Sequence, residues 1–497
     1  MLPRSAIRFM AYSIANRLKR ERFLRYLFDL TTTAQWRGPA VGIVRVEQEL
    51  ARRAHRHLGN NVAFCLYDSA KTAIVTIDDS VALDLIEGRI RVDIPDKQAA
   101  RVAESPVRRR ARLALLSNTT VYYLFQRARG RSLTREEVLQ IQARELPRNK
   151  TEPAREREAA VSRGEADTIT LDELPHHQAL LDADTTIISG GLDWQYKNLR
   201  ALWQLKKKYR FSYCAVVYDL IAVQFPHFVI PGYVELLTDY FGELLWLADQ
   251  TLCISQTTRT DWLSHACDVG AEPVPSRVFP LGCDLSPHAG DSNIDLPAAL
   301  NGKQFALYVS TIEPRKNHYM LYQALEEGIR TKQLDAERDR LVLVGRRGWA
   351  TEDLLHEITT NPLTKDTIII LHDVSDKQLA GLYQRCSLVL FPSMYEGFGL
   401  PLAEALSYGK PCLASNAGAL SEIGGDLVMR LDPKDTLAWT RTIGQLMSSP
   451  AELKLWGERI DTTYRPVTWD DAAHHFFDAL SEPNCDTHHR ETMPAAS

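Results

Sequence analysis

The segment 387–408 constrains the fold of this chain more than any other. An apolar run typical of a strand, 387–391, is followed by the turn Gly397-Phe398-Gly399 and then by a run typical of a helix, 402–408. In parallel α/β sheets, a strand, a glycine-rich turn and a helix present backbone N–H groups and a positive helix end to an anionic ligand. The segment therefore predicts a doubly wound α/β domain with an anion site at this turn.

Two carboxylates flank the turn. Glu396 directly precedes Gly397, and Glu404 falls in the first turns of the expected helix. Carboxylates accept hydrogen bonds from sugar hydroxyls, whereas the turn itself suits phosphate. The pattern therefore predicts a ligand with phosphates at one end and hydroxyls at the other, such as a nucleotide-sugar. Two solvated carboxylates that complement the helix dipole are the alternative interpretation.

Size and composition limit the class of protein. A chain of 497 residues is too long for a single core and indicates two or more domains. Its net charge of −4 gives no indication of nucleic-acid binding. No Cys-x-x-Cys pair occurs, and several cysteines lie in apolar strand-like runs, which favours buried free thiols and a cytoplasmic location. The cysteines expected to be buried are Cys65, Cys214, Cys253 and Cys412.

Alternating strand-like and helix-like runs predict two Rossmann-like halves. The expected regions are a basic amphipathic segment, 1–30; an N-terminal Rossmann-like domain, 31–290, with a charged insertion at about 99–172; a C-terminal Rossmann-like domain, 291–467; and a helix with a disordered tail, 468–497. A helix over residues 1–28 would either lie on the anionic surface of the inner membrane or dock its apolar side on the domain. The expected strands are 62–66, 73–77, 185–189, 213–218, 251–255, 305–310, 341–345, 367–371, 387–391, 411–415 and 427–431.

Residues 391–404 resemble the glutamate–seven–glutamate motif of retaining GT-B glycosyltransferases, in particular family 4, which holds many bacterial polysaccharide mannosyltransferases. Three further stretches occur in the order of that family: 308–317, 341–349 and 371–383. The resemblance implies a GT-B fold, with two Rossmann-like doubly wound parallel-sheet domains facing a cleft. It implies that the domain 31–290 binds the acceptor, that the domain 291–467 binds the nucleotide-sugar, and that the helix from residue 468 crosses back onto the first domain. It also implies a retaining hexosyltransferase that moves a sugar from a nucleotide-diphosphate-sugar to a hydroxyl of a glycan or lipid-linked acceptor in bacterial surface polysaccharide synthesis. Mannose, from GDP-mannose, is the first expectation.

The resemblance implies roles for individual residues. Glu404 would hold the ribose, and Glu396 would position the donor sugar. Lys316 and Arg315 would neutralise the diphosphate leaving group, so no essential metal is expected. Many relatives carry a further arginine six residues before this lysine, where the present chain has Ser310. The other donor-binding residues implied are Gly397, Phe398, Gly399, Gly345, Arg346, Val374 and Gly42, with a surface loop as the alternative for Arg346 and a plain strand-to-helix turn for Gly42.

In the first half, Tyr218 and Asp219 follow a strand at the place where many relatives carry His-Asp. A phenol thus replaces the imidazole, and Asp219 becomes the expected acceptor-side carboxylate. A carboxylate that only caps the next segment is the competing interpretation.

Two other functions fit the same fold. A nucleotide-sugar epimerase would need acid/base groups on both faces of the sugar, and Tyr218 removes one candidate. A non-catalytic scaffold of an assembly complex is favoured by Ser310 and Tyr218, and opposed by Lys316, Glu396 and Glu404.

Overall fold

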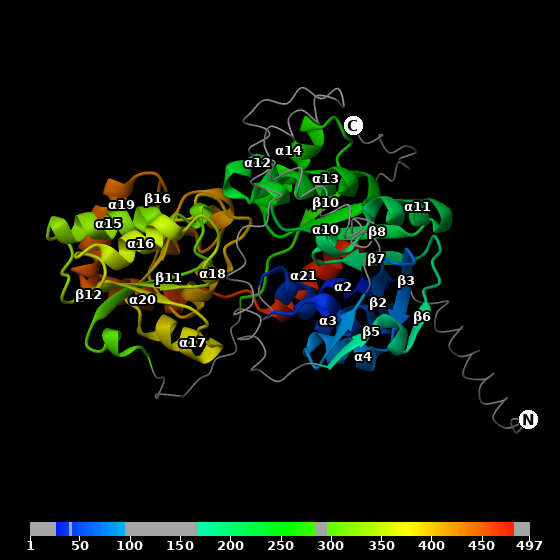
Figure 1. Cartoon of the computed structure of the whole chain (residues 1–497), viewed down its shortest axis with the longest axis horizontal. Helices are drawn as coiled ribbons and strands as arrows, with labels where there is room; N and C mark the ends of the chain where they lie inside the picture. Colours follow the sequence, from blue (N-terminus) through cyan, green and yellow to red (C-terminus); the bar gives the residue numbers. More distant parts are fainter. Residues whose placement is uncertain (1–25, 39–41, 95–166, 284–295, 482–497) are drawn as a thin grey trace, which may run out of the picture.

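The computed structural model describes residues 26–38, 42–94, 167–283 and 296–481. These residues form two α/β domains that lie side by side along the long axis of the molecule (Figure 1). The predicted fold class, two Rossmann-like sheets, is confirmed. The expected basic segment up to residue 25, most of the charged insertion and the tail from residue 482 lie outside the described residues, so membrane contact by the first segment stays a prediction.

The N-terminal domain is built on an eight-stranded sheet in the order β10-β9-β8-β7-β1-β2-β3-β6. The strands from β10 to β2 are parallel, whereas β3 and β6 pair antiparallel at one edge, so the sheet is mixed and not all parallel as predicted. The bounds are β1 Tyr26–Asp29, β2 Val62–Asp68, β3 Ala73–Ile77, β6 His176–Gln178, β7 Thr186–Ser189, β8 Ser212–Val217, β9 Gln250–Cys253 and β10 Ser276–Val278.

Two short strands correct the sequence predictions. β1 lies in the middle of the sheet, where a helix was expected to run to residue 28. All four of its residues are buried, and a short, continuously apolar run buried on both faces is typical of a parallel strand. The second correction concerns the end of the charged insertion, where β5 (Asp167–Thr170) pairs with β4 (Ile90–Asp93) in a separate two-stranded sheet.

The C-terminal domain has a six-stranded sheet, all parallel, in the order β13-β12-β11-β14-β15-β16. Every strand expected in this half is present within two residues of its predicted bounds. The central strands β11, β12, β14 and β15 are largely buried and mostly apolar, as is typical of a parallel sheet covered on both faces. The bounds are β11 Gln304–Val309, β12 Asp339–Val344, β13 Ile368–Leu371, β14 Leu388–Phe391, β15 Cys412–Ser415 and β16 Val428–Leu431.

Helices cover both sheets (Figure 1). Those of the N-terminal domain are α2 Thr31–Gln35, α3 Ile43–Leu58, α4 Asp79–Ile86, α10 Asp193–Tyr196, α11 Leu199–Tyr209, α12 Ile221–Gln224, α13 Pro231–Leu247 and α14 Gln256–Asp268. Those that follow are α15 His318–Arg330, α16 Glu352–Thr360, α17 Asp376–Arg385, α18 Leu400–Ser407, α19 Thr436–Met447, α20 Pro450–Thr463 and α21 Trp469–Ser481.

The last helix returns to the first domain. Figure 1 shows α21, drawn in red, beside the blue helix α3. Phe476 and Phe477 of α21 are buried in the same apolar cluster as Val46 and Leu50 of α3. The two connections between the domains meet where Cys283 N donates to Val467 O at 3.0 Å. The C-terminal end of the described chain therefore belongs to the N-terminal core.

The four cysteines predicted to be buried are buried, and each is a free thiol. Over the described ranges, none of the helices combines the length and the apolar character needed to cross a bilayer.

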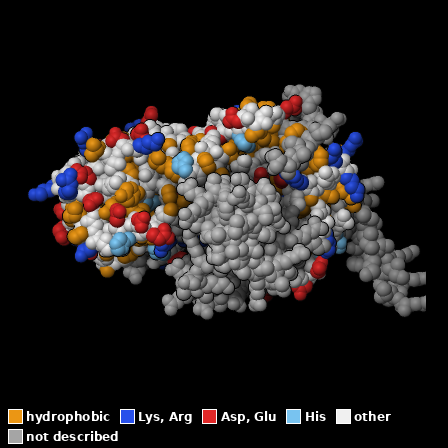
Figure 2. Space-filling view, turned by 45° about the horizontal axis from the view of Figure 1, so that its top comes forward, with side chains coloured by type: hydrophobic (Ala, Val, Ile, Leu, Met, Phe, Trp, Pro, Cys, Tyr) orange, Lys and Arg blue, Asp and Glu red, His pale blue; other side chains and the backbone are white. Residues whose placement is uncertain are grey.

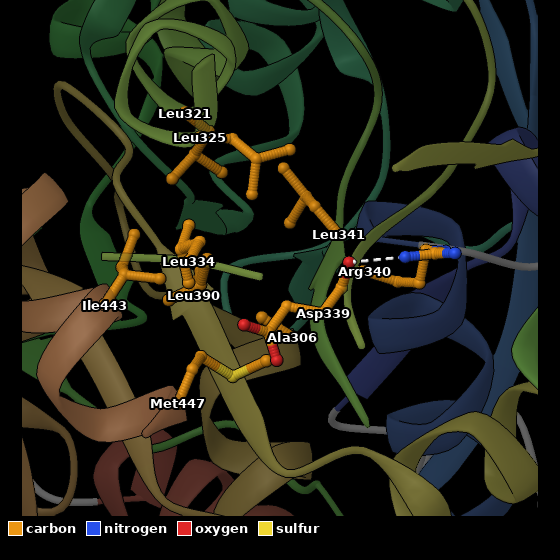
Figure 3. A pocket seen from close by; sticks show the side chains of 10 residues that line it. All are labelled: Ala306, Leu321, Leu325, Leu334, Asp339, Arg340, Leu341, Leu390, Ile443 and Met447. Atoms are coloured by element: carbon orange, nitrogen blue, oxygen red, sulfur yellow. Dashed lines mark hydrogen bonds between the residues drawn. The ribbon is translucent and has the colours of Figure 1, made fainter. Parts of the chain in front are cut away.

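A small cavity lies inside the C-terminal domain (Figure 3), with a volume of about 10 Å³. This is about the space of one water molecule. Its lining is mostly aliphatic, from Leu321, Leu325, Leu334, Leu341, Leu390, Ile443 and Met447. The cavity is therefore a packing gap of the core and does not form a substrate site.

Candidate donor site between the two domains

The turn after β14 has the backbone that an anion site requires. Gly399 is the N-cap of α18 and has a φ of 119°, a conformation that glycine adopts without strain. Pro401 lies in the first turn of that helix. At Gly397, a Cβ atom would lie 2.3 Å from the carbonyl oxygen of Tyr218, in the other domain. Gly397 is thus needed because two backbones from different domains approach each other here.

Glu396 holds two cations at the mouth of this turn. Its Oε1 lies 2.5 Å from Lys316 Nζ, and its Oε2 lies 2.8 Å from Arg315 Nη1. Burial alone would raise the pKa of Glu396, but the two cations outweigh it and lower that pKa to about 2. Burial and the neighbouring Arg315 lower the pKa of Lys316, whereas the carboxylates around Arg315 raise the pKa of its guanidinium against the effect of burial. The Glu396 carboxylate is therefore ionised at neutral pH, and it lies in a buried cluster with the two basic side chains.

The loop that carries these cations is fixed to the loop that carries Glu396. Arg315 Nη1 donates to Tyr395 O at 2.7 Å, and Tyr308 Oη donates to Lys316 O at 2.8 Å. Asn317, which has a φ of 60°, donates from its amide to Pro392 O at 3.1 Å. Because β11 and β14 are neighbours in the sheet, the loops after their carboxyl ends meet at one edge.

Glu404 lies inside α18, is 6% exposed and connects the two domains. Its Oε1 lies 3.4 Å from Nη1 of Arg45 on α3, and its Oε2 accepts from Tyr383 Oη at 3.4 Å. Burial raises the pKa of Glu404, although Arg45 opposes this. Gly42, the N-cap of α3 with a φ of 53°, stands one turn before Arg45 and has open space where a Cβ would lie. The start of α3 therefore faces Glu404 across the boundary between the domains.

Asp219 joins the group from the N-terminal domain. It follows β8, and its Oδ1 accepts from Ile221 N at 3.1 Å at the start of α12. Burial raises its pKa, while Arg315 and Lys316 lower it and Glu396 raises it. These electrostatic effects place Asp219 beside the Glu396 cluster. It accepts the first backbone N–H of α12, which agrees with the capping interpretation, whereas its role toward an acceptor stays a prediction.

The comparisons with known proteins agree with this geometry. Residues 295–462 match the family described as glycosyl transferases group 1. The C-terminal domain is therefore similar to that family, and it is called the group 1 domain after this match. The predicted resemblance of the chain to bacterial mannosyltransferases with a GT-B fold is thereby confirmed.

Curated relatives match part of the chain. The serotype-specific mannosyltransferase WbdA of Escherichia coli is 30% identical over 221 residues, which are 42% of this chain and 26% of WbdA. The O-antigen chain mannosyltransferase B of Escherichia coli is 34% identical over 166 residues, 33% of this chain and 42% of that protein. Both matches thus span less than half of the relative. Among solved structures, Anabaena Alr3699/HepE in complex with UDP and glucose is 18% identical, with a TM-score of 0.49 over 60% of this chain and 78% of that one.

In this group 1 domain an uncharged pair stands where relatives carry the second arginine. Ser310 Oγ lies 3.2 Å from His318 Nε2. The imidazole of His318 is buried, which lowers its pKa to about 3, so it is neutral. The arginine found here in many relatives of the family is therefore not replaced by another charged group. Instead, Arg315 binds Oε2 of Glu396, whereas Lys316 binds Oε1.

The remaining predicted donor residues lie on neighbouring loops of the group 1 domain. A Cβ on Gly345 would lie 1.9 Å from Ser310 O, so glycine is required where the loops after β11 and β12 touch. Phe398 packs against the cores of both domains. Arg346 is exposed, and Val374 packs against the domain core at the end of β13. Of these four, Gly345 and Phe398 shape the site, and Arg346 has the exposure expected of a surface loop.

Sequence reasoning missed the contacts that join the group 1 domain to α14. Tyr395 Oη donates to Asp261 Oδ2 at 2.6 Å, and Thr258 Oγ1 donates to Gly397 O at 3.2 Å. The carboxylate of Glu422 accepts from the backbone N–H groups of Gln256 and Thr257, at 2.8 and 2.7 Å, and so caps α14 from the opposite domain. No sequence pattern signals these pairs, since their partners are more than a hundred residues apart.

Proposed function

We propose that the protein is a retaining glycosyltransferase that moves a sugar from a nucleotide-diphosphate-sugar to a hydroxyl of a glycan. Mannose from GDP-mannose is the proposed donor, because the relatives WbdA and mannosyltransferase B carry mannosyltransferase names. One observation carries the proposal. Glu396, Lys316 and Arg315 form a single buried cluster beside a helix N-terminus, at the edge of a parallel sheet where such folds bind nucleotides.

In this proposal each residue has a defined task. The diphosphate binds at the turn 397–399, and Lys316 with Arg315 stabilises the charge that develops as it leaves. Glu396 holds both cations in place and faces the donor sugar. The acceptor oxygen forms its bond to the anomeric carbon on the face from which the diphosphate departs, and its proton passes to the leaving phosphate. Configuration is then retained, without a covalent intermediate on the enzyme.

Asp219 is the proposed acceptor-side carboxylate. Burial raises its pKa, and in this proposal its carboxylate accepts a hydrogen bond from the acceptor hydroxyl and orients it, while the proton itself passes to the leaving phosphate. Tyr218 cannot take the place of the missing histidine, because it is buried and its hydroxyl donates to Gly190 O. Because two cations face the diphosphate, we propose that turnover needs no divalent metal and is unchanged by EDTA.

Nucleotide binding tests the proposal. A ligand that binds the folded state at about a hundred times its Kd stabilises it by about 2.7 kcal/mol, so thermal unfolding with GDP, UDP, GDP-mannose and UDP-glucose reports affinity. We expect stabilisation by GDP and GDP-mannose, and a loss of it in Glu404→Ala. Glu352→Ala, on the same domain but exposed, is the matched control. An unchanged affinity of the Glu404→Ala variant for GDP would contradict the proposal that Glu404 holds the ribose.

A non-catalytic scaffold is the second candidate, because Ser310 and Tyr218 depart from the relatives at two positions in the site. Such a protein binds a nucleotide without consuming it. Incubating the purified protein with GDP-mannose and measuring released GDP, with and without a saccharide acceptor, separates the two. Binding without release supports the scaffold.

A further inference from the structure

One surface of the N-terminal domain exposes apolar side chains in a row. Ile230, Tyr233 and Leu236, at the start of α13, are 47%, 45% and 40% exposed. Their spacing of three residues keeps them on one side of the helix. Phe225 and Phe228 precede them, with ring centroids 6.2 Å apart, and His227 packs on Phe228 at 4.2 Å. We call these five apolar residues, 225, 228, 230, 233 and 236, the aromatic shelf.

Exposed apolar residues are ordinary when they are scattered. Figure 2 shows such side chains interspersed with charged ones over the described part of one face. The shelf differs because its members are neighbours. Phe225 and Phe228 lie on the turn before α13, and the other three residues follow one side of the start of that helix. A clustered apolar surface rimmed by polar groups is typical of a binding site.

The shelf is continuous with the donor site. The ring of Phe225 lies 4.7 Å from that of Tyr395, centroid to centroid. Tyr395 directly precedes Glu396, and its carbonyl accepts from Arg315. At the other end of α12, Asp219 caps the helix. A molecule lying on the shelf would therefore have one end beside Asp219 and the Glu396 cluster.

The charge of this region selects among possible occupants. Residues 211–258 contain no lysine or arginine, and they contain five carboxylates. Two of these carboxylates pair with cations of α11, Glu243 with Arg200 and Asp249 with Lys206. Glu235 and Asp239 are exposed on α13, the helix that carries Tyr233 and Leu236. These exposed carboxylates would repel an anionic membrane surface. A neutral saccharide fits, because its hydroxyls can donate to carboxylates while its apolar ring faces pack on aromatic side chains.

We propose that the aromatic shelf binds the neutral saccharide chain of the acceptor, behind the sugar whose hydroxyl reacts. This rests on the proposed function, since it assigns the acceptor of the same site. The enzyme then prefers an oligosaccharide to a single sugar, because the additional rings contact the shelf.

Binding of defined oligosaccharides tests the proposal. The probes are α-mannotetraose and, as a neutral chain of different linkage, maltotetraose, titrated calorimetrically into the full-length protein. We expect at least one tetrasaccharide to bind more tightly than methyl α-mannoside, and Tyr233→Ala to weaken that binding by about five- to tenfold. Tyr319→Ala is the matched control, since Tyr319 is 47% exposed on a helix of the other domain. The side chain of Tyr233 is 45% exposed, so its removal leaves the fold intact.

Three results would overturn the proposal. These are no binding of either tetrasaccharide to the unaltered protein, equal binding by the Tyr233→Ala variant, or equal weakening by Tyr233→Ala and Tyr319→Ala. A fourth is association with phosphatidylcholine vesicles containing phosphatidylglycerol that Tyr233→Ala abolishes, because the shelf would then be a membrane contact. GDP is titrated in parallel. If saccharide binds at the shelf but GDP does not bind, the proposed donor chemistry fails while the saccharide site stands.

Discussion

Replacing Glu396 by glutamine tests the electrostatics of the donor site most directly. Glutamine keeps the shape of the side chain but leaves Lys316 and Arg315, which lie 2.5 and 2.8 Å from its carboxylate, facing a neutral amide. Breaking a buried pair by removing one partner costs about 3–5 kcal/mol. The lowering of the pKa of Glu396 from 4.5 to about 2 corresponds to about 3 kcal/mol in the same direction. We therefore expect the free energy of unfolding of the C-terminal domain to fall by about 3 kcal/mol.

Urea unfolding at neutral pH, followed by intrinsic fluorescence, measures this difference. Glu352→Gln is the matched control, because Arg347 lies 2.8 Å from the Glu352 carboxylate, the same distance as in the Arg315–Glu396 pair, but both partners are exposed. Solvent screens such a pair, and its loss should change stability little. Because the pKa of Glu396 is lowered on folding, its contribution is complete above about pH 4.5 and is lost as the pH falls toward 2. The reasoning is refuted if the two variants lose the same small amount of stability.

Three further changes have definite outcomes. Lys316→Ala should reduce kcat by about 10²–10³, as removal of a charge-stabilising group does; near-normal release of GDP from GDP-mannose would exclude it from the site. Gly397→Ala would bring a Cβ to 2.3 Å from Tyr218 O and should separate the domains, visible as a larger radius of gyration in X-ray scattering, whereas Gly232→Ala, which has open space, should not. Burial raises the pKa of Glu47 to about 8, so its contribution to stability is complete below about pH 4.5 and is lost as the pH rises through 8. Glu47→Gln should flatten that pH dependence in urea unfolding, and an unchanged slope would rule out this role.

The parts of the fold that depend on short-range pattern were predictable. The strand, glycine turn and helix of 387–408 are local, and the structure shows β14, Gly399 and α18 in that order. Parallel strands bring their carboxyl ends to one edge of a sheet, and the loops after β11 and β14 meet there. β1 was missed because four residues are too few to show a period, and the basic stretch before them favoured a helix.

Contacts between distant segments could not be read in this way. The bond between Lys316 and Glu396 joins residues that are eighty positions apart. Only the resemblance to a family predicted that the two residues lie in one site. Arg45 had no signal except its place one turn after Gly42, at the start of a helix. Glu422 had no sequence signal at all, because a carboxylate that caps a helix of another domain has no fixed spacing from that helix along the chain.

The position of Arg45 shows why these long-range contacts matter for function. Glu404 is the carboxylate proposed to hold the ribose, and each of its oxygens already accepts one bond, from Arg45 of one domain and Tyr383 of the other. A carboxylate offers about four acceptor positions, so two remain for ribose hydroxyls. Arg45, a cation from the N-terminal domain, lowers the pKa of Glu404 against the effect of burial, which on balance raises it. If Glu404 holds the ribose as proposed, the donor site is complete only while the two domains are in contact, since Arg45 belongs to one domain and Glu404 to the other.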